Sequence, residues 1–142
     1  MEQQLGFTTA PDGVNICYAT VGEGPPLVKA PNWLSHLEYD WRSPVWRHWW
    51  EELAWDHRFI RFDKRGIGLS DWDVEDMFFE ARVGDLETVV DALGLETFAL
   101  LGISRGGAAA AEYSIRHPER VTHLIINGGF AAGPTLRDRT PE

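Results

Sequence analysis

Apolar residues occur along this chain in short runs, separated by segments of helical periodicity. Strands are predicted over 14–18, 27–30, 58–62, 97–101 and 121–126. An earlier extended run is joined to the first of these strands by the turn signal Pro11-Asp12-Gly13, which predicts a hairpin. Because the later strands alternate with helices, the pattern favours an α/β fold with a mostly parallel sheet and flanking helices on both faces.

Three helices are expected between these strands. Ser43-Pro44 is a start signal for the first, with Ser43 as the N-cap and Pro44 at the first helical position. The second runs from about 74 to 93 and carries an apolar stripe, with Gly94 as its C-terminal stop. The third covers 105–116, is rich in alanine, and is closed by the proline that follows it.

Composition narrows the class of protein. The chain has 142 residues, which suits a single domain over 1–142, and its 44% hydrophobic content is typical of a globular core. With a net charge of -9 it repels phosphate backbones and anionic membranes, so neither nucleic acid nor membrane is an expected partner. The single cysteine, Cys17, excludes an internal disulfide and is expected to be buried. No Cys/His cluster indicates a metal, and neither a signal peptide nor a membrane span is recognisable, so a cytoplasmic location is expected.

The segment Gly102-Ile103-Ser104-Arg105-Gly106 fits the pattern G-x-S-x-G between a predicted strand and a predicted helix. A sharp strand-to-helix turn strains the backbone of its serine, and side chains at the flanking glycines would collide. The free N–H groups and the positive dipole end of the following helix point at the same place as the serine hydroxyl. Ser104 is therefore a candidate nucleophile, and the Arg105 amide is a candidate oxyanion donor. The alternative is a tight packing turn with an inert serine.

Beyond this motif, the chain resembles the N-terminal half of the α/β-hydrolase superfamily. The similar segments are the opening hairpin and third strand (12–18 and 22–28), the D-x-R-G-x-G-x-S loop (62–70) and the approach to the sixth strand (117–121). In detail the chain is most similar to hydrolase domains found alone or fused to nucleotide cyclases and transcriptional regulators. The resemblance implies a truncated α/β-hydrolase fold of about six strands, in which Asp63 and Arg65 have structural roles.

The resemblance also places an oxyanion loop after the third strand. Pro31-Asn32 stands where the family often has His-Gly, which assigns the second oxyanion amide to Trp33 and puts Asn32 beside the substrate. Simple packing is the alternative for Trp33. No metal or organic cofactor is implied.

The acid and the histidine of the family's catalytic triad follow the serine in the chain, and this chain has little room for them. His117 is expected to be solvated at the far end of a helix roughly 18 Å long, and His123 to be partly buried in a strand. His36, just past the presumed oxyanion loop, is the best candidate within the chain for the general base. Otherwise a second subunit supplies the base, or the chain is catalytically poor.

The last predicted strand has a further consequence. Residues 124–126 would form an apolar sheet edge, which invites pairing with another chain, so a homo-oligomer through this edge is expected. The expected function is a serine hydrolase acting on a small-molecule carboxylic ester, because epoxide and halide reactions on this fold usually need a carboxylate in place of Ser104. The rival is an inactive hydrolase-fold binding or regulatory module that lacks the acid and the histidine of the triad.

Overall fold

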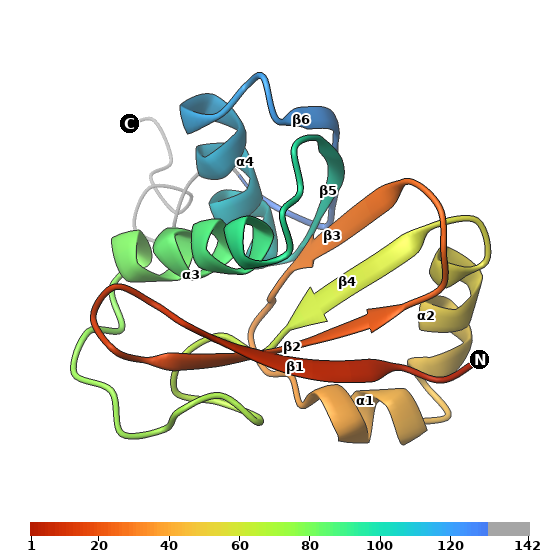
Figure 1. Cartoon of the computed structure of the whole chain (residues 1–142), viewed down its shortest axis with the longest axis horizontal. Coiled ribbons are helices and arrows are strands. Elements are labelled where there is room, and N and C mark those ends of the chain that lie inside the picture. Colours follow the sequence, from red (N-terminus) through yellow and green to blue (C-terminus); the bar gives the residue numbers. More distant parts are fainter. Residues whose placement is uncertain (131–142) are drawn as a thin grey trace, which may run out of the picture.

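The computed structural model describes residues 1–130, which form a sheet of six strands with helices on both faces (Figure 1). The strands are β1 (Gln4–Thr9), β2 (Asn15–Val21), β3 (Pro26–Ala30), β4 (Arg58–Phe62), β5 (Phe98–Ile103) and β6 (Val121–Asn127). The helices are α1 (Leu37–Arg42), α2 (Arg47–Ala54), α3 (Phe79–Ala92) and α4 (Gly106–Arg116). The order across the sheet is β1-β2-β4-β3-β5-β6, with an antiparallel hairpin at one side and four parallel strands after it. The predicted α/β class and mostly parallel sheet are confirmed.

The two faces of the sheet carry separate hydrophobic clusters, because successive side chains of a strand point to opposite faces. Val28 and Leu100 pack with α3 and α4 in one cluster. Their neighbours Leu27 and Leu101 pack with α1 and α2 in the other. The buried Cys17 belongs to a smaller third cluster, and burial raises the pKa of its thiol to about 12, so its predicted burial is confirmed.

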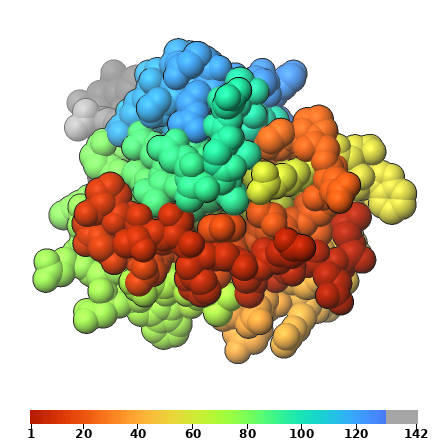
Figure 2. Space-filling view, in the orientation of Figure 1, coloured from red at the N-terminus to blue at the C-terminus, as the bar shows by residue number. Residues whose placement is uncertain are grey.

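The two edges of the sheet are β1 and β6. In the space-filling view, β1 (red) crosses the front of the molecule below its middle, and the chain from α4 to β6 (blue) lies at the top (Figure 2). Leu124, Ile125 and Ile126 are 42%, 44% and 44% exposed. Because these consecutive residues face opposite sides, both faces of β6 lack full cover. The same openness exposes His123, so its predicted partial burial is wrong.

The second helix begins later than predicted. Ser43 is not its N-cap: it has extended backbone and ends α1, with its amide bonded to the Asp40 carbonyl. A turn follows, and α2 begins at Arg47. Helical periodicity did not reveal α1 because six residues make fewer than two turns.

The start of α3 also differs from the prediction. It begins at Phe79 rather than near Val74, because the Asp76 carboxylate accepts the Phe78 amide at 2.9 Å and holds the preceding residues in a turn. Its end agrees with the prediction, since Gly94 follows the helix with a φ of 63°. None of the helices among the described residues is long and apolar enough to cross a membrane.

Candidate active site

Ser104 stands between β5 and α4 in a backbone conformation that is rare for a residue with a side chain. Its φ is 53°, and no other non-glycine among residues 1–130 has a positive φ. Such a conformation costs about 1–3 kcal/mol and is typical of functional sites. The Ser104 amide donates to the Asn127 carbonyl at 2.9 Å, and its own carbonyl accepts the Gly107 amide at 3.1 Å. β6 and the first turn of α4 therefore hold the strained residue in place.

The two glycines of the motif are required by close backbone contacts. A Cβ at Gly102 would lie 2.6 Å from Gly107 Cα, and a Cβ at Gly106 would lie 2.8 Å from the Ala30 carbonyl oxygen. Side chains cannot occupy either position without moving backbone. The helix that follows Ser104 thus begins directly against the loop that leaves β3, and the predicted steric role of the glycines is confirmed.

The two predicted oxyanion donors are both available. Neither the Arg105 amide nor the Trp33 amide donates a hydrogen bond to a described residue. The Trp33 side chain is 63% exposed, so simple packing does not explain it. The contact between Gly106 and Ala30 brings the start of this loop to the nucleophile turn. The pairing of the two amides on one oxyanion stays a prediction.

Asn32 is held by a residue that the sequence did not single out. Its side-chain oxygen accepts a hydrogen bond from Lys29 Nζ at 3.1 Å. Lys29 lies in β3 with only 5% of its surface exposed, and burial lowers the pKa of its ammonium to about 8, with Arg61 adding repulsion. The signal available in the sequence was a single lysine inside a short apolar strand. The predicted contact of Asn32 with substrate is untested.

His36 has a local structural role. Its Nδ1 accepts the Tyr39 amide at 3.4 Å as the N-cap of α1, and its ring stacks on Tyr39 with the ring centroids 4.0 Å apart. Its own amide donates to Asp40 at 3.3 Å. Among the described residues, no hydrogen bond joins any histidine to Ser104. His36 as the general base stays a prediction without structural support.

His117, at the far end of the helix that follows the motif, lies away from Ser104. His117 caps the C-terminal end of the eleven-residue α4, which places it roughly 16 Å along the helix axis from the Ser104 turn. It is not merely solvated as predicted, since its Nε2 lies 3.0 Å from Glu87 and its ring packs on Tyr113. No group of three or more His, Cys, Asp or Glu side chains in residues 1–130 is arranged to hold a metal ion.

The loop after β4 has the structural role that the family resemblance implied. Asp63 is fully buried and accepts hydrogen bonds from Ser35 Oγ at 2.6 Å and from two backbone amides. Arg65 pairs with Asp85 at 2.9 Å and with Asp12 at 2.6 Å. The hydrogen bonds to Asp85 and Asp12 raise the pKa of Arg65 above its ordinary value. This loop thus fixes the segment that follows Trp33, as well as the start of α3.

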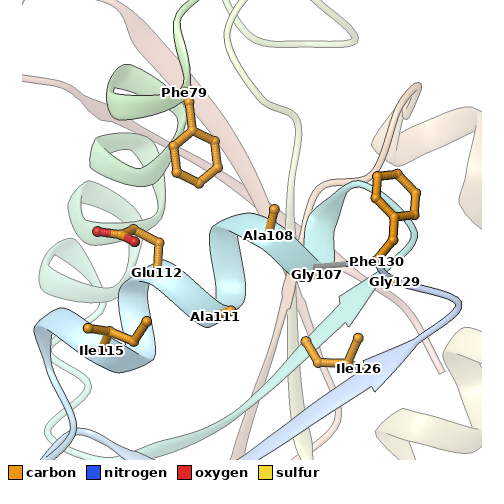
Figure 3. Close-up of a pocket in the computed structure, with 9 residues that line it drawn as sticks. All are labelled: Phe79, Gly107, Ala108, Ala111, Glu112, Ile115, Ile126, Gly129 and Phe130. Carbon is orange, nitrogen blue, oxygen red and sulfur yellow. The ribbon is translucent and has the colours of Figure 1, made fainter. Parts of the chain in front are cut away.

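An open apolar groove of about 490 Å³ lies beside the nucleophile turn (Figure 3). Ala108, Ala111 and Ile115 of α4 form its floor, and Phe79 of α3 and Ile126 of β6 form its walls. One end reaches the backbone of the nucleophile turn, since a Cβ at Gly129 would lie 3.6 Å from the Ser104 carbonyl oxygen. The groove continues the uncovered face of β6.

The sequence that forms this site matches the model of a known protein family. The model for the alpha/beta hydrolase fold matches residues 35–140, a span that contains the nucleophile turn, the buried Asp63–Arg65 loop and three of the six strands described here, β4, β5 and β6. The chain belongs to the α/β-hydrolase family.

Individual relatives of this α/β-hydrolase chain are hydrolases of several kinds. It is 31% identical over 130 residues to the AB hydrolase superfamily protein YisY of Bacillus subtilis, covering 90% of this chain and 46% of that protein. It is 35% identical over 89 residues to epoxide hydrolase 3 of Xenopus tropicalis, covering 61% of this chain and 24% of that protein. The structure of an esterase from Exiguobacterium antarcticum superposes with a TM-score of 0.70 at 29% identity, covering 88% of this chain and 45% of that one. The chain thus spans about a quarter to a half of the length of these relatives.

Proposed function

We propose that the chain is a serine hydrolase that acts on small-molecule carboxylic esters. The observation that carries this proposal is Ser104, held at a φ of 53° between β5 and the first turn of α4. A strained serine at the start of a helix is typical of a nucleophile presented to a substrate, and the Arg105 and Trp33 amides, unpaired among residues 1–130, are the proposed oxyanion donors. A hydroxyl, and not a carboxylate, stands at this position, which favours ester over epoxide chemistry among the reactions of the relatives.

In the proposed reaction, Ser104 Oγ attacks the acyl carbon while a base takes the hydroxyl proton. The carbonyl oxygen becomes an oxyanion that accepts hydrogen bonds from the Arg105 and Trp33 amides, at the positive end of α4. The bond between the acyl carbon and the alcohol oxygen breaks, and the alcohol leaves with the proton. Water then attacks the acyl-serine, releases the acid and restores the hydroxyl. Loss of one oxyanion donor typically slows such a reaction by about 10²–10³-fold.

The base is the part of this reaction that the described residues do not provide, since Ser104 Oγ has no hydrogen-bond partner among them. We propose that a second copy of the chain pairs with the open edge of β6 and completes the site. Leu124, Ile125 and Ile126 offer apolar surface on both faces of this strand, and no acidic residue of β6 opposes a second acidic chain. The groove beside α4 extends this surface toward Ser104.

The missing base also favours one rival function. A chain that presents Ser104 and two free amides without a base could bind an acyl compound or its acid without turning it over. Turnover by the purified chain distinguishes this binding module from the enzyme.

The first experiment compares hydrolysis of p-nitrophenyl acetate by the wild-type chain, Ser104→Ala and Ser114→Ala. Ser114 is a matched control, because it lies on α4 and its hydroxyl bonds, among the described residues, only to the Ala110 carbonyl of its own helix. Turnover that disappears in Ser104→Ala and persists in Ser114→Ala supports the serine hydrolase. Equal background rates in all three chains would leave the binding module.

The oligomer is tested on the same preparations by measuring molecular mass in solution at micromolar concentration. Ile125→Lys places a charge on β6, and Phe7→Lys places one on β1, the opposite edge of the sheet. The proposed assembly is lost in Ile125→Lys and kept in Phe7→Lys. A monomeric wild-type chain rejects assembly through β6.

A further inference from the structure

Two cations are buried side by side beneath α1 and α2. The parallel register of β3 and β4 sets Lys29 opposite Arg61, and the two residues are 5% and 4% exposed. Within residues 1–130, the only ion pair that either makes is a long one, 4.0 Å from Arg61 to Asp40. Arg61 Nε has no hydrogen-bond partner there. Buried charges with so few partners destabilise a fold. The contacts that Lys29 makes therefore indicate its role.

Lys29 holds the loop that carries the predicted oxyanion amide. Its Nζ donates to Asn32 Oδ1 at 3.1 Å and makes a longer contact of 3.5 Å with the Ala30 carbonyl oxygen. That same Ala30 oxygen is the atom against which Gly106 packs. A continuous set of contacts therefore runs from Lys29 through residues 30–32 to the start of α4, directly after Ser104.

The surroundings of Lys29 restrict its ammonium to this position. The Trp50 ring lies 5.5 Å from Nζ, close enough for a cation–π interaction. Lys29, Asn32, Trp50 and Ile103 help to enclose a cavity of about 20 Å³, which has room for about one water molecule. The buried Trp50 Nε1 has no protein partner among the described residues, so it can donate to such a water.

We propose that Lys29 is a positioning residue for the oxyanion loop, residues 30–33, which it fixes through Asn32 so that the Trp33 amide is held beside Ser104. This role rests on the proposed hydrolase function. Lys29 does not touch the reacting atoms; its charge-assisted hydrogen bond removes freedom from the loop that does.

The charged groups around Lys29 predict a pH dependence for this role. Arg61 from β4 repels the ammonium, and Asp40 from α1 and Asp63 after β4 attract it. Trp46 and Trp50 of α2 and Ile103 of β5 do not titrate. With the pKa of Lys29 lowered to about 8, the ammonium is lost above that pH, and ester turnover is expected to fall there. A lysine acting as the general base would give the opposite trend, a rise in turnover through pH 8.

The first test needs no activity, because the chain contains only two lysines, Lys29 and Lys64. Protein labelled with ¹³C at lysine Cε gives two NMR signals, and Lys64→Arg assigns them. The Lys29 signal is expected to titrate near pH 8 and to shift in Asn32→Ala. A Lys29 signal that titrates like a free lysine, or that is unchanged in Asn32→Ala, overturns the proposal.

The second test follows the loop and the reaction in Lys29→Met, with Lys64→Met as the control. The ¹⁵N order parameters of the Asn32 and Trp33 amides are expected to fall below about 0.6 in Lys29→Met only, and kcat to fall about 10²-fold with little change in KM. The double variant Lys29→Met/Asn32→Ala is expected to be no slower than either single variant. Unchanged order parameters in Lys29→Met, or additive losses of kcat in the double variant, overturn the positioning role. If the wild-type chain lacks turnover, the hydrolase proposal fails, while the lysine NMR signals and the amide order parameters still decide whether Lys29 fixes the loop.

Discussion

Two buried groups of charge in this molecule are built in opposite ways. Arg65 lies between Asp85 and Asp12, with ion pairs of 2.9 and 2.6 Å, and joins the loop after β4 to α3 and to the β1–β2 turn. Lys29 and Arg61 are as deeply buried, but their only ion pair among the described residues is the 4.0 Å contact between Arg61 and Asp40. The first group compensates its charge fully, and the second does not.

The difference indicates what each group does. Paired and hydrogen-bonded charges such as those of Arg65 fasten elements that are distant in sequence, and breaking them leaves an isolated charge. Lys29 fastens only the short loop over the nucleophile turn, while burial holds its pKa near 8. We therefore interpret the Arg65 group as serving stability and the Lys29 group as serving the site at some cost in stability.

The largest expected effect comes from breaking the paired group. Arg65→Met leaves the fully buried Asp85 without its partner and is expected to lower the free energy of unfolding by about 3–5 kcal/mol. Urea denaturation followed by tryptophan fluorescence measures this loss. Arg116→Met is the matched control, because Arg116 makes contacts of 2.6 and 2.8 Å to more exposed carboxylates, and such solvent-screened pairs contribute little to stability. Similar losses in the two variants would contradict the contrast between buried and exposed pairs.

A smaller effect is expected from Arg61→Met. It removes the hydrogen bond to Gln3 at 2.7 Å but also relieves the repulsion of Lys29, so a loss of about 1 kcal/mol is expected. The pKa of Lys29 should rise above 8, although burial, the larger cause, keeps it below that of a free lysine. The lysine NMR signal reports this change. A Lys29 pKa that does not rise would show that the two cations do not interact.

The contrast between the two groups also marks what the sequence could predict. The nucleophile turn was predictable, because Gly102, Ser104 and Gly106 encode it locally between an apolar strand and an alanine-rich helix. The partners of Arg65 were not, because Asp12 and Asp85 come close to it only after the sheet and α3 have assembled. In the same way, the register of β3 with β4 sets Lys29 opposite Arg61, and the sequence of neither strand alone reveals this pairing.

The base was the part of the site on which sequence reasoning failed to converge. His36 was attractive because it follows the oxyanion loop, but a six-residue helix that periodicity could not detect uses its Nδ1 as a cap. Which side chains come together in a site depends on tertiary contacts, whereas the nucleophile turn depends on steric rules within five residues. The cytoplasmic location and the single-domain boundaries stay predictions.

The smallest expected effect is a gain in stability. Lys29→Met replaces a poorly paired buried charge with an apolar side chain of similar length, and the free energy of unfolding is expected to rise by roughly 0.5–1 kcal/mol near pH 7. Thermal unfolding should then shift upward by about 1–4 °C for a chain of this size. A variant that is more stable yet slower on esters would separate the two roles that the comparison assigns.

The pH dependence of this gain gives a sharper test, since its sign follows from the lowered pKa of Lys29. The folded chain loses the Lys29 proton near pH 8, whereas the unfolded chain keeps it until about pH 10.5, the ordinary value. Between these values the unfolded state binds more protons, so the wild-type chain gains stability relative to Lys29→Met as pH rises. The advantage of Lys29→Met is therefore complete below pH 8, shrinks as pH rises above 8, and reverses before pH 10.5 because one pKa unit corresponds to about 1.4 kcal/mol. Ionisation of Cys17 is common to both chains and cancels in the difference. A stability difference that stays constant from pH 7 to 10.5 would show that burial does not lower the pKa of Lys29. The contrast between Lys29 and Arg65 would then not hold.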